Sequence, residues 1–244
     1  MSAISLAKNG DIAEGVKPVF YRYPQSTEVN RIIPKNKLYE QAKVNSSIRE
    51  LFVTQVEQIT WSNKLSAQTL NIEANEKVTE IQIFKIVLKG EELALDVLQT
   101  IDKAIPHPIF FKIVSQNNKR KIVASYKVIN IKGAVTLSDY YASAWQFDVD
   151  NGDGDGDGER NPLPLALNSK ALYENLLAAL LPYQLQEGEG FTELIKRIDV
   201  INKLKKQQVQ INKRLRNEKQ FKHKILINAE LKKINKQLKQ LISG

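Results

Sequence analysis

The chain has 244 residues, of which 42% are hydrophobic and 26% charged, so it is long and apolar enough to bury a folded core. It contains no cysteine, which excludes disulfides, thiolate catalysis and cysteine-ligated zinc. Its apolar runs fall far short of the roughly 20 residues that a membrane span needs, and the first residues lack the pattern of a secretory signal. We therefore expect a cytoplasmic protein with no membrane association.

The pattern of apolar and turn-forming residues predicts an α+β domain over 18–183, a mixed α/β sheet with flanking helices, after a flexible tail at 1–17. Asparagines at 116–120 suit the turn of a β-hairpin, and Ser46 or Ser47 suits the cap of the second helix. In chain order, the predicted elements are a short strand at 18–23, helices at 35–43 and 46–58, β-rich stretches at 59–61 and 80–89, a helix at 91–104, strands at 107–115, 121–130, 135–145 and 163–167, and a helix at 169–181.

Positive charge is concentrated in a basic helical arm at 191–244. This segment holds 15 Lys and Arg against 4 Asp and Glu, whereas the other 190 residues hold 21 basic and 23 acidic groups. Such an asymmetry favours a polyanionic partner or an acidic protein surface, and a solvated helix face is the alternative.

The second half of the arm carries a coiled-coil seam. Apolar residues spaced by steps of four and three are typical of such a seam, and the stripe weakens around 216–220. We therefore prefer a folded-back hairpin, with Asn228 as the cap of its second helix, and an intermolecular coiled coil that makes a homo-oligomer stays open. The seam residues are Ile227, Leu231, Ile234, Leu238 and Leu241.

Basic residues of the arm are the candidates for contact with nucleic acid or a partner, together with Lys64, which follows the aromatic Trp61. No base-reading motif accompanies them, so the expected contact is electrostatic. The candidates are Lys64, Lys203, Lys205, Lys206, Lys213, Arg214, Arg216, Lys219, Lys222 and Lys224.

The sequence contains no catalytic signature that identifies a reaction, and we lean toward a protein that is not an enzyme. Weak candidates for a PD-(D/E)xK nuclease are Glu57, Glu80, Gln82 and Lys85, because that site uses acidic groups and a lysine on a strand to bind an activating divalent ion. Gln82 stands where the lysine is usual, so a structural strand edge is the alternative. His107, between two prolines, suits a turn better than a general base.

The acidic Gly-Asp run at 148–161 resembles the opening of a calcium-binding loop. The twelfth position counted from Asn151 is Pro162, so the bidentate glutamate of such a loop is missing. We expect a flexible acidic loop, no metal site and no cofactor.

Several short motifs together resemble the domain-of-unknown-function 4391 family over about residues 23–241. They are VNR at 29–31, IPK at 33–35 with Tyr39, ITWSNKL at 59–65, TLN at 69–71, EIQI at 80–83, IDKAIP at 101–106, EKQF at 218–221 and NAEL at 228–231. The resemblance implies no established activity, and it implies bacterial gene neighbourhoods with helicases and DNA methyltransferases in restriction-type or phage-defence clusters.

The expected function is thus a non-enzymatic accessory subunit of a bacterial DNA-targeting defence or restriction-type system. Its arm would bind a helicase or DNA methyltransferase partner, or DNA itself. The alternatives are a metal-dependent nuclease of PD-(D/E)xK type and a self-associating scaffold.

Overall fold

The computed structural model describes residues 19–129, 134–147 and 161–243. The chain divides into two compact units, Met1–Leu181 and Pro182–Gly244. The predicted tail at 1–17 and nearly all of the predicted acidic loop at 148–161 lie outside the described residues. No helix in the described part of the chain has the length and apolar character that a membrane crossing requires.

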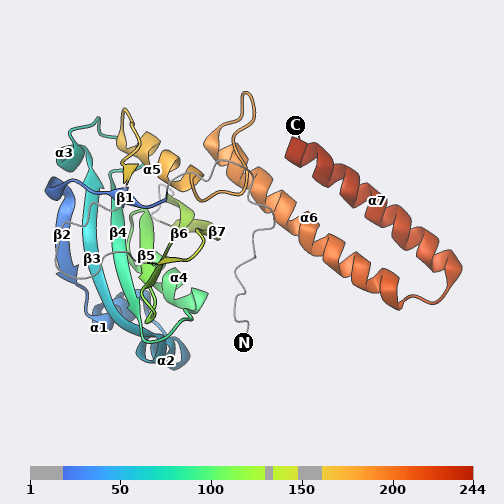
Figure 1. The fold of residues 1–244 in the computed structure, drawn as a ribbon, viewed down its shortest axis with the longest axis horizontal. Helices are drawn as coiled ribbons and strands as arrows, with labels where there is room; N and C mark the ends of the chain where they lie inside the picture. Colours follow the sequence, from blue (N-terminus) through green and yellow to red (C-terminus); the bar gives the residue numbers. More distant parts are fainter. Residues whose placement is uncertain (1–18, 130–133, 148–160, 244) are drawn as a thin grey trace. The chain divides into compact units, whose positions relative to one another are not determined.

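A mixed seven-stranded sheet forms the body of the first unit (Figure 1), which confirms the predicted α+β class. The strands run in the order β2-β3-β4-β5-β6-β7, with β8 paired to β6, and a separate parallel pair joins β1 to β9. The strands are β1 (Tyr21–Arg22), β2 (Glu28–Ile32), β3 (Val56–Ser66), β4 (Glu80–Leu88), β5 (Ile109–Val114), β6 (Lys119–Ile129), β7 (Val135–Ala142), β8 (Gln146–Phe147) and β9 (Asn161–Pro162).

The centre of the sheet combines a parallel crossover with a hairpin. Strands β4 and β5 are parallel, and helix α4 (Leu95–Ala104) connects them, as a parallel pair requires. Strands β5 and β6 form the predicted hairpin. Asn118 in its turn has φ of 52°, a left-handed conformation that asparagine tolerates.

The remaining helices of the first unit are short, and α1, α2 and α5 end one to three residues earlier than predicted. Helix α2 stops at Gln55 rather than at 58, because Val56 already pairs with Leu88 of β4. Its cap is Asn45, whose Oδ1 accepts from the Ile48 amide at 3.0 Å, so the predicted serine cap was wrong. The helices are η1 (Gln25–Thr27, a 3-10 turn), α1 (Lys35–Ala42), α2 (Ser46–Gln55), α3 (Ala67–Leu70) and α5 (Ser169–Ala178).

Both faces of the sheet are buried, by alternate residues of the same strands. Phe111 of β5 lies in a core with Phe84 of β4 and Ile101 of α4. The neighbouring Phe110 meets the ring of Tyr173 on α5 edge-on at 6.0 Å. Residues Phe111 and Tyr173 are each no more than 1% exposed, so α4 and α5 contact opposite faces of the sheet.

The strand predicted at 163–167 does not form. The two-residue β9 is parallel to β1 and ends at Pro162, and farther along the Leu167 carbonyl accepts from the Glu73 amide beside an isolated parallel bridge between Glu73 and Asn168. Prolines at 162 and 164 lack the amide hydrogens that a longer ladder needs. Leu165 and Leu167 are 97% and 81% exposed as a result.

The second unit contains the predicted helical hairpin, made of α6 (Phe191–Asn217) and α7 (Phe221–Ser243), as Figure 1 shows. The turn falls at 218–220, close to the predicted break. Asn228 lies inside α7, so its predicted role as a cap was wrong. Glu218 precedes the helix instead, and its Oε1 accepts from the Lys219 and Gln220 amides, both at 2.8 Å.

Candidate functional site

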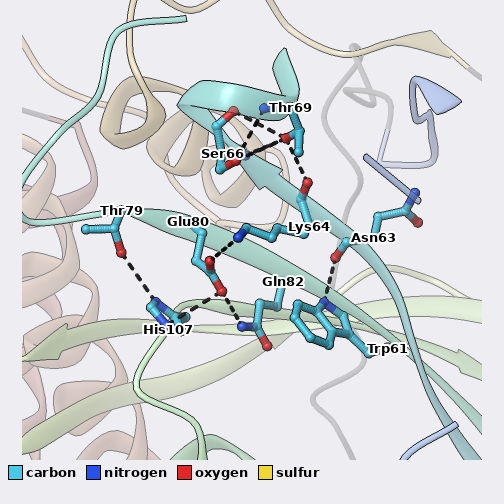
Figure 2. A network of polar contacts seen from close by, with 9 residues as sticks. All are labelled: Trp61, Asn63, Lys64, Ser66, Thr69, Thr79, Glu80, Gln82 and His107. Atoms are coloured by element: carbon cyan, nitrogen blue, oxygen red, sulfur yellow. Dashed lines mark hydrogen bonds and ion pairs between the residues drawn. The ribbon is translucent and has the colours of Figure 1, made fainter. Parts of the chain in front are cut away.

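The adjoining ends of β3, β4 and β5 bring four polar side chains together: Lys64, Glu80, Gln82 and His107 (Figure 2), named here the Glu80 cluster. Lys64 pairs with Gln82 across the β3–β4 ladder. Gln82 pairs in turn with Ile109 on β5, two residues after His107. The cluster therefore joins three neighbouring strands at one edge of the mixed sheet.

A β-bulge in β3 places Lys64 on the same face as Glu80. Up to Trp61, which pairs with Phe84, the register is regular, and it shifts by one residue before Asn63, which pairs with Ile83. Without this shift Lys64 would pair with Ile81 and point to the opposite face, because a slip of one residue inverts side-chain direction. The Trp61 Nε1 donates to the Asn63 carbonyl at 3.1 Å across the bulge.

Glu80 is held as a carboxylate by its neighbours. Its side chain is 15% exposed, and its Oε2 lies 3.1 Å from Lys64 Nζ. The Gln82 amide donates to Oε1. Burial raises the pKa of Glu80, but the hydrogen bonds from Gln82 and Lys64 and the charges of His107 and Lys64 together bring that pKa below its ordinary value.

His107 connects Glu80 to the solvent-exposed Thr79. Its Nε2 is 3.6 Å from Glu80 Oε1, and its Nδ1 is 3.5 Å from Thr79 Oγ1, with the donor set by the tautomer. Burial lowers the pKa of His107, Glu80 raises it, and the positive charges of Lys127 and Lys64 lower it. The net pKa is below 6.5, so the imidazole is largely neutral at neutral pH.

A buried lysine fixes the loop that carries His107. Lys127 Nζ lies 2.6 Å from Asp102 Oδ1, with both side chains almost fully buried. It also donates to the carbonyls of Ile105 at 3.1 Å and His107 at 2.7 Å. The Tyr140 hydroxyl donates to the second oxygen of Asp102. This network ties the end of α4 to the start of β5, and thereby sets where the imidazole lies.

The Glu80 cluster can accept and pass a proton, since a carboxylate and a neutral imidazole face each other. Within the described ranges, no three His, Asp or Glu side chains are grouped closely enough to hold a metal ion. The acidic run at 148–160 lies outside those ranges.

The structure brings together two of the four weak catalytic candidates and leaves two apart. Glu80 and Gln82 are in contact. Glu57 follows Val56, which pairs with Leu88 at the other end of β4, roughly 26 Å along the strand. Lys85 is five residues from Glu80, an odd step that turns it to the opposite face.

The sequence model of the family described as Domain of unknown function (DUF4391) matches residues 22–238. The chain belongs to the DUF4391 family. No curated protein and no solved structure matches it. Because the match runs from β1 into the last turns of α7, the mixed sheet and the helical hairpin are both parts of the DUF4391 pattern.

Nine of the ten predicted binding residues of this DUF4391 chain lie on the hairpin, and Lys64 lies in the Glu80 cluster instead. The nine are exposed except for Lys224, which is half-buried. Sequence reasoning missed four more exposed lysines farther along α7, namely Lys232, Lys233, Lys236 and Lys239. Their spacing of three and four residues outside the seam was the available signal.

The predicted seam packs inside the hairpin. Ile227, Ile234 and Leu238 are buried in a cluster with Ile201 and Ile211 of α6. The other two seam residues, Leu231 and Leu241, pack partly buried against the same cluster. The apolar stripe of α7 is thus covered by α6 of the same chain.

Proposed function

We propose that this DUF4391 member is a non-enzymatic accessory subunit of a bacterial DNA-targeting defence or restriction-type system. In this proposal the hairpin binds a helicase or DNA methyltransferase partner, or DNA, and the mixed-sheet unit supports it. The observation that carries the proposal is the division of the hairpin into a closed apolar seam and an exposed basic surface.

The closed seam bears on how the hairpin meets a partner. Seam side chains packed against α6 are not available to a further helix, so recognition through them would require the hairpin to open. What the closed hairpin offers is its charge, 15 Lys and Arg against 4 Asp and Glu over 191–244. A surface of this sign attracts phosphates and acidic protein surfaces over about 8–10 Å at physiological salt.

The proposal is tested by co-purification with the proteins encoded beside this chain, with and without nuclease treatment. The variant replaces four exposed cations near the hairpin turn, Lys213, Arg216, Lys219 and Lys222, by glutamine in the full-length chain. We expect loss of the partner or of nucleic acid, because these cations lie outside the seam and their removal leaves its packing intact. Undiminished recovery of both would refute the proposal.

A second candidate function is a nuclease centred on Glu80. The contact of Glu80 with Gln82, Lys64 and His107 at one sheet edge favours it, whereas the lack of a metal-binding group among the described residues speaks against it. It predicts magnesium-dependent cleavage of DNA that is lost in Glu80→Gln and kept in Glu57→Gln. Absence of cleavage by the unaltered protein, assayed together with its co-purifying partner, counts against this candidate.

The third possibility, a self-associating scaffold, requires the arm to pair between chains. In the closed hairpin the α7 seam is occupied by α6 of the same chain. A mass by light scattering that rises with protein concentration, and that returns to one chain in Leu238→Asp, would favour the scaffold over the accessory subunit.

A further inference from the structure

Two hydrogen bonds between α6 and α7 mark opposite sides of the hairpin. Gln208 Nε2 donates to Asn235 Oδ1 at 2.7 Å, and Arg214 Nη1 donates to Glu230 Oε2 at 3.4 Å. Glu230 and Asn235 are five residues apart on α7, roughly 140° around the helix at 100° per residue. The seam lies between them, so each bond borders a different broad side of the hairpin.

The side marked by Gln208 and Asn235 carries cations and amides. On α7, steps of three and four residues from Asn235 reach Lys232, Asn228 and Lys239, and similar steps on α6 connect Gln208 with Lys205. We name this side the basic face. Its members are Asn202, Lys205, Gln208, Val209, Asn212 and Arg216 on α6, and Phe221, Lys224, Asn228, Lys232, Asn235 and Lys239 on α7.

The two sides of the hairpin differ in their acidic residues rather than in their number of cations. The basic face has five cations, and none of its twelve members is acidic. The side marked by Arg214 includes Glu230, which already engages that arginine. On this second side, steps of three and four residues also reach the exposed cations Lys196, Lys203, Lys222 and Lys233.

The shape and composition of the basic face suit a nucleic-acid duplex better than a protein. The exposed apolar residues on or beside the face are Val209, Phe221 and Ile225, whereas the centre of a protein interface is apolar and poor in charge. A single strand is bound by stacking its bases on several aromatic rings, and Phe221 is the one aromatic member here. Rows of lysine and asparagine on two adjacent rigid helices match phosphate contacts, which position a duplex without reading its sequence.

We infer that the basic face binds the phosphate backbone of duplex DNA without sequence preference. This inference rests on the proposed function. It narrows the binding partner of the hairpin from a protein or DNA to duplex DNA bound at the basic face. The contacts would come from Lys205, Arg216, Lys232 and Lys239 at its exposed positions, with Asn228 and Asn235 as uncharged donors.

The test compares two full-length variants that lose the same charge. One carries Lys205→Gln, Lys232→Gln and Lys239→Gln on the basic face, and the other carries Lys196→Gln, Lys203→Gln and Lys233→Gln on the opposite side. Binding to a fluorescent 30-base-pair duplex of arbitrary sequence is measured from low to physiological salt. Each lost phosphate contact reduces the magnitude of the slope of log affinity against log salt by about 0.9. The three substitutions of the basic-face variant should therefore reduce the magnitude of this slope by about 2.7.

The outcomes separate this inference from the proposed function. A large loss of slope and affinity in the basic-face variant with little in the opposite-side variant supports the inference. Equal losses in both overturn the assignment of the face and leave DNA binding by the arm standing. If the unaltered protein binds no duplex but retains a helicase or methyltransferase partner, the inference fails and the proposed function survives.

Discussion

Lys127 and Asp102 form an ion pair of 2.6 Å between side chains that are 1% and 2% exposed. The lysine also donates to three backbone carbonyls, those of Asp102, Ile105 and His107. Burial lowers the pKa of Lys127 and raises that of Asp102, and each charge opposes the shift of the other. The pair therefore links α4 and β6 in the interior and reaches the loop of the Glu80 cluster.

Removal of one partner of this pair should destabilise the protein strongly. Lys127→Met leaves the Asp102 carboxylate buried without its cation, although it still accepts from the Tyr140 hydroxyl, and such changes cost about 3–5 kcal/mol. Urea unfolding followed by circular dichroism measures the free energy of unfolding.

The double variant Asp102→Asn with Lys127→Met provides the control. It removes both charges and keeps an amide beside Tyr140, so we expect it to be more stable than the sum of the two single changes by at least about 1 kcal/mol. Additive losses would show that the two charges do not stabilise each other.

Periodicity in the sequence predicts the order and type of most elements, because it reports which side chains face a core. Strand β4 and the β5–β6 hairpin follow from runs such as 80–89 and 107–115. The Glu80 cluster could not be predicted this way, since it depends on the bulge at 61–63 and on a pairing between strands distant in sequence. The Asp102–Lys127 pair likewise joins residues 25 positions apart.

The pattern of the arm was more informative than that of the domain. The seam spacing favours a hairpin, because an apolar seam must be covered by another helix. The weakening of the stripe around 216–220 predicts where the chain turns back. The start of α7 was placed too late because Asn228 is a favoured capping residue in general. Helix α7 instead begins at Phe221, directly after a turn in which the Glu218 carboxylate accepts from the Lys219 and Gln220 amides, and a glutamate at that position carries no comparable sequence signal.

The ring of His107 should titrate below its ordinary value of 6.5, and two neighbours should move the midpoint in opposite directions. Glu80→Gln removes a negative charge that raises the pKa of His107, so the midpoint should fall further. Lys64→Gln removes a positive charge that lowers it, so the midpoint should rise. The Cε1 proton resonance of His107, followed by NMR against pH, measures each midpoint.

The same shift predicts how stability depends on pH. The pKa of His107 is lower in the folded than in the unfolded chain, so folding disfavours protonation of the imidazole. The stabilisation that the neutral imidazole contributes is therefore lost as the pH falls below about 6.5 toward the folded pKa. His107→Gln should flatten the stability curve in that window. An unchanged slope between pH 6.5 and 5 would contradict the assigned direction.

Arg197 joins α6 to the end of α7, at the end of the hairpin away from its turn, and its loss should loosen the last turn of α7. Its guanidinium forms two hydrogen bonds of 2.7 Å with Glu189 and donates to the Leu241 carbonyl at 3.0 Å. Arg197→Lys cannot keep this forked geometry. We expect faster amide hydrogen exchange over the last turn of α7, with the other turns unaffected.

Arg214→Lys is the matched control for Arg197→Lys. Arg214 meets Glu230 at 3.4 Å with both side chains about half exposed, and pairs of that kind contribute little to stability.

Acidification should imitate the loss of Arg197. Hydrogen bonds from Arg197, against the opposing effect of burial, place the pKa of Glu189 below its ordinary value. The stability that the Glu189 carboxylate provides therefore disappears as the pH falls through that lowered pKa.

Truncating one seam side chain should destabilise the hairpin. The concentration dependence of amide exchange should then show whether the same chain or a second chain covers the seam. Ile234 is 7% exposed and packs among Ile201, Ile211 and Leu238, so Ile234→Ala should cost about 2–4 kcal/mol of hairpin stability. The adjacent exposed Lys233→Ala serves as control, with an expected change within about 0.5 kcal/mol. Because α6 of the same chain covers the seam, amide exchange in α7 should accelerate equally at low and high protein concentration. Exchange that slows as the concentration rises would instead place a second chain on the seam.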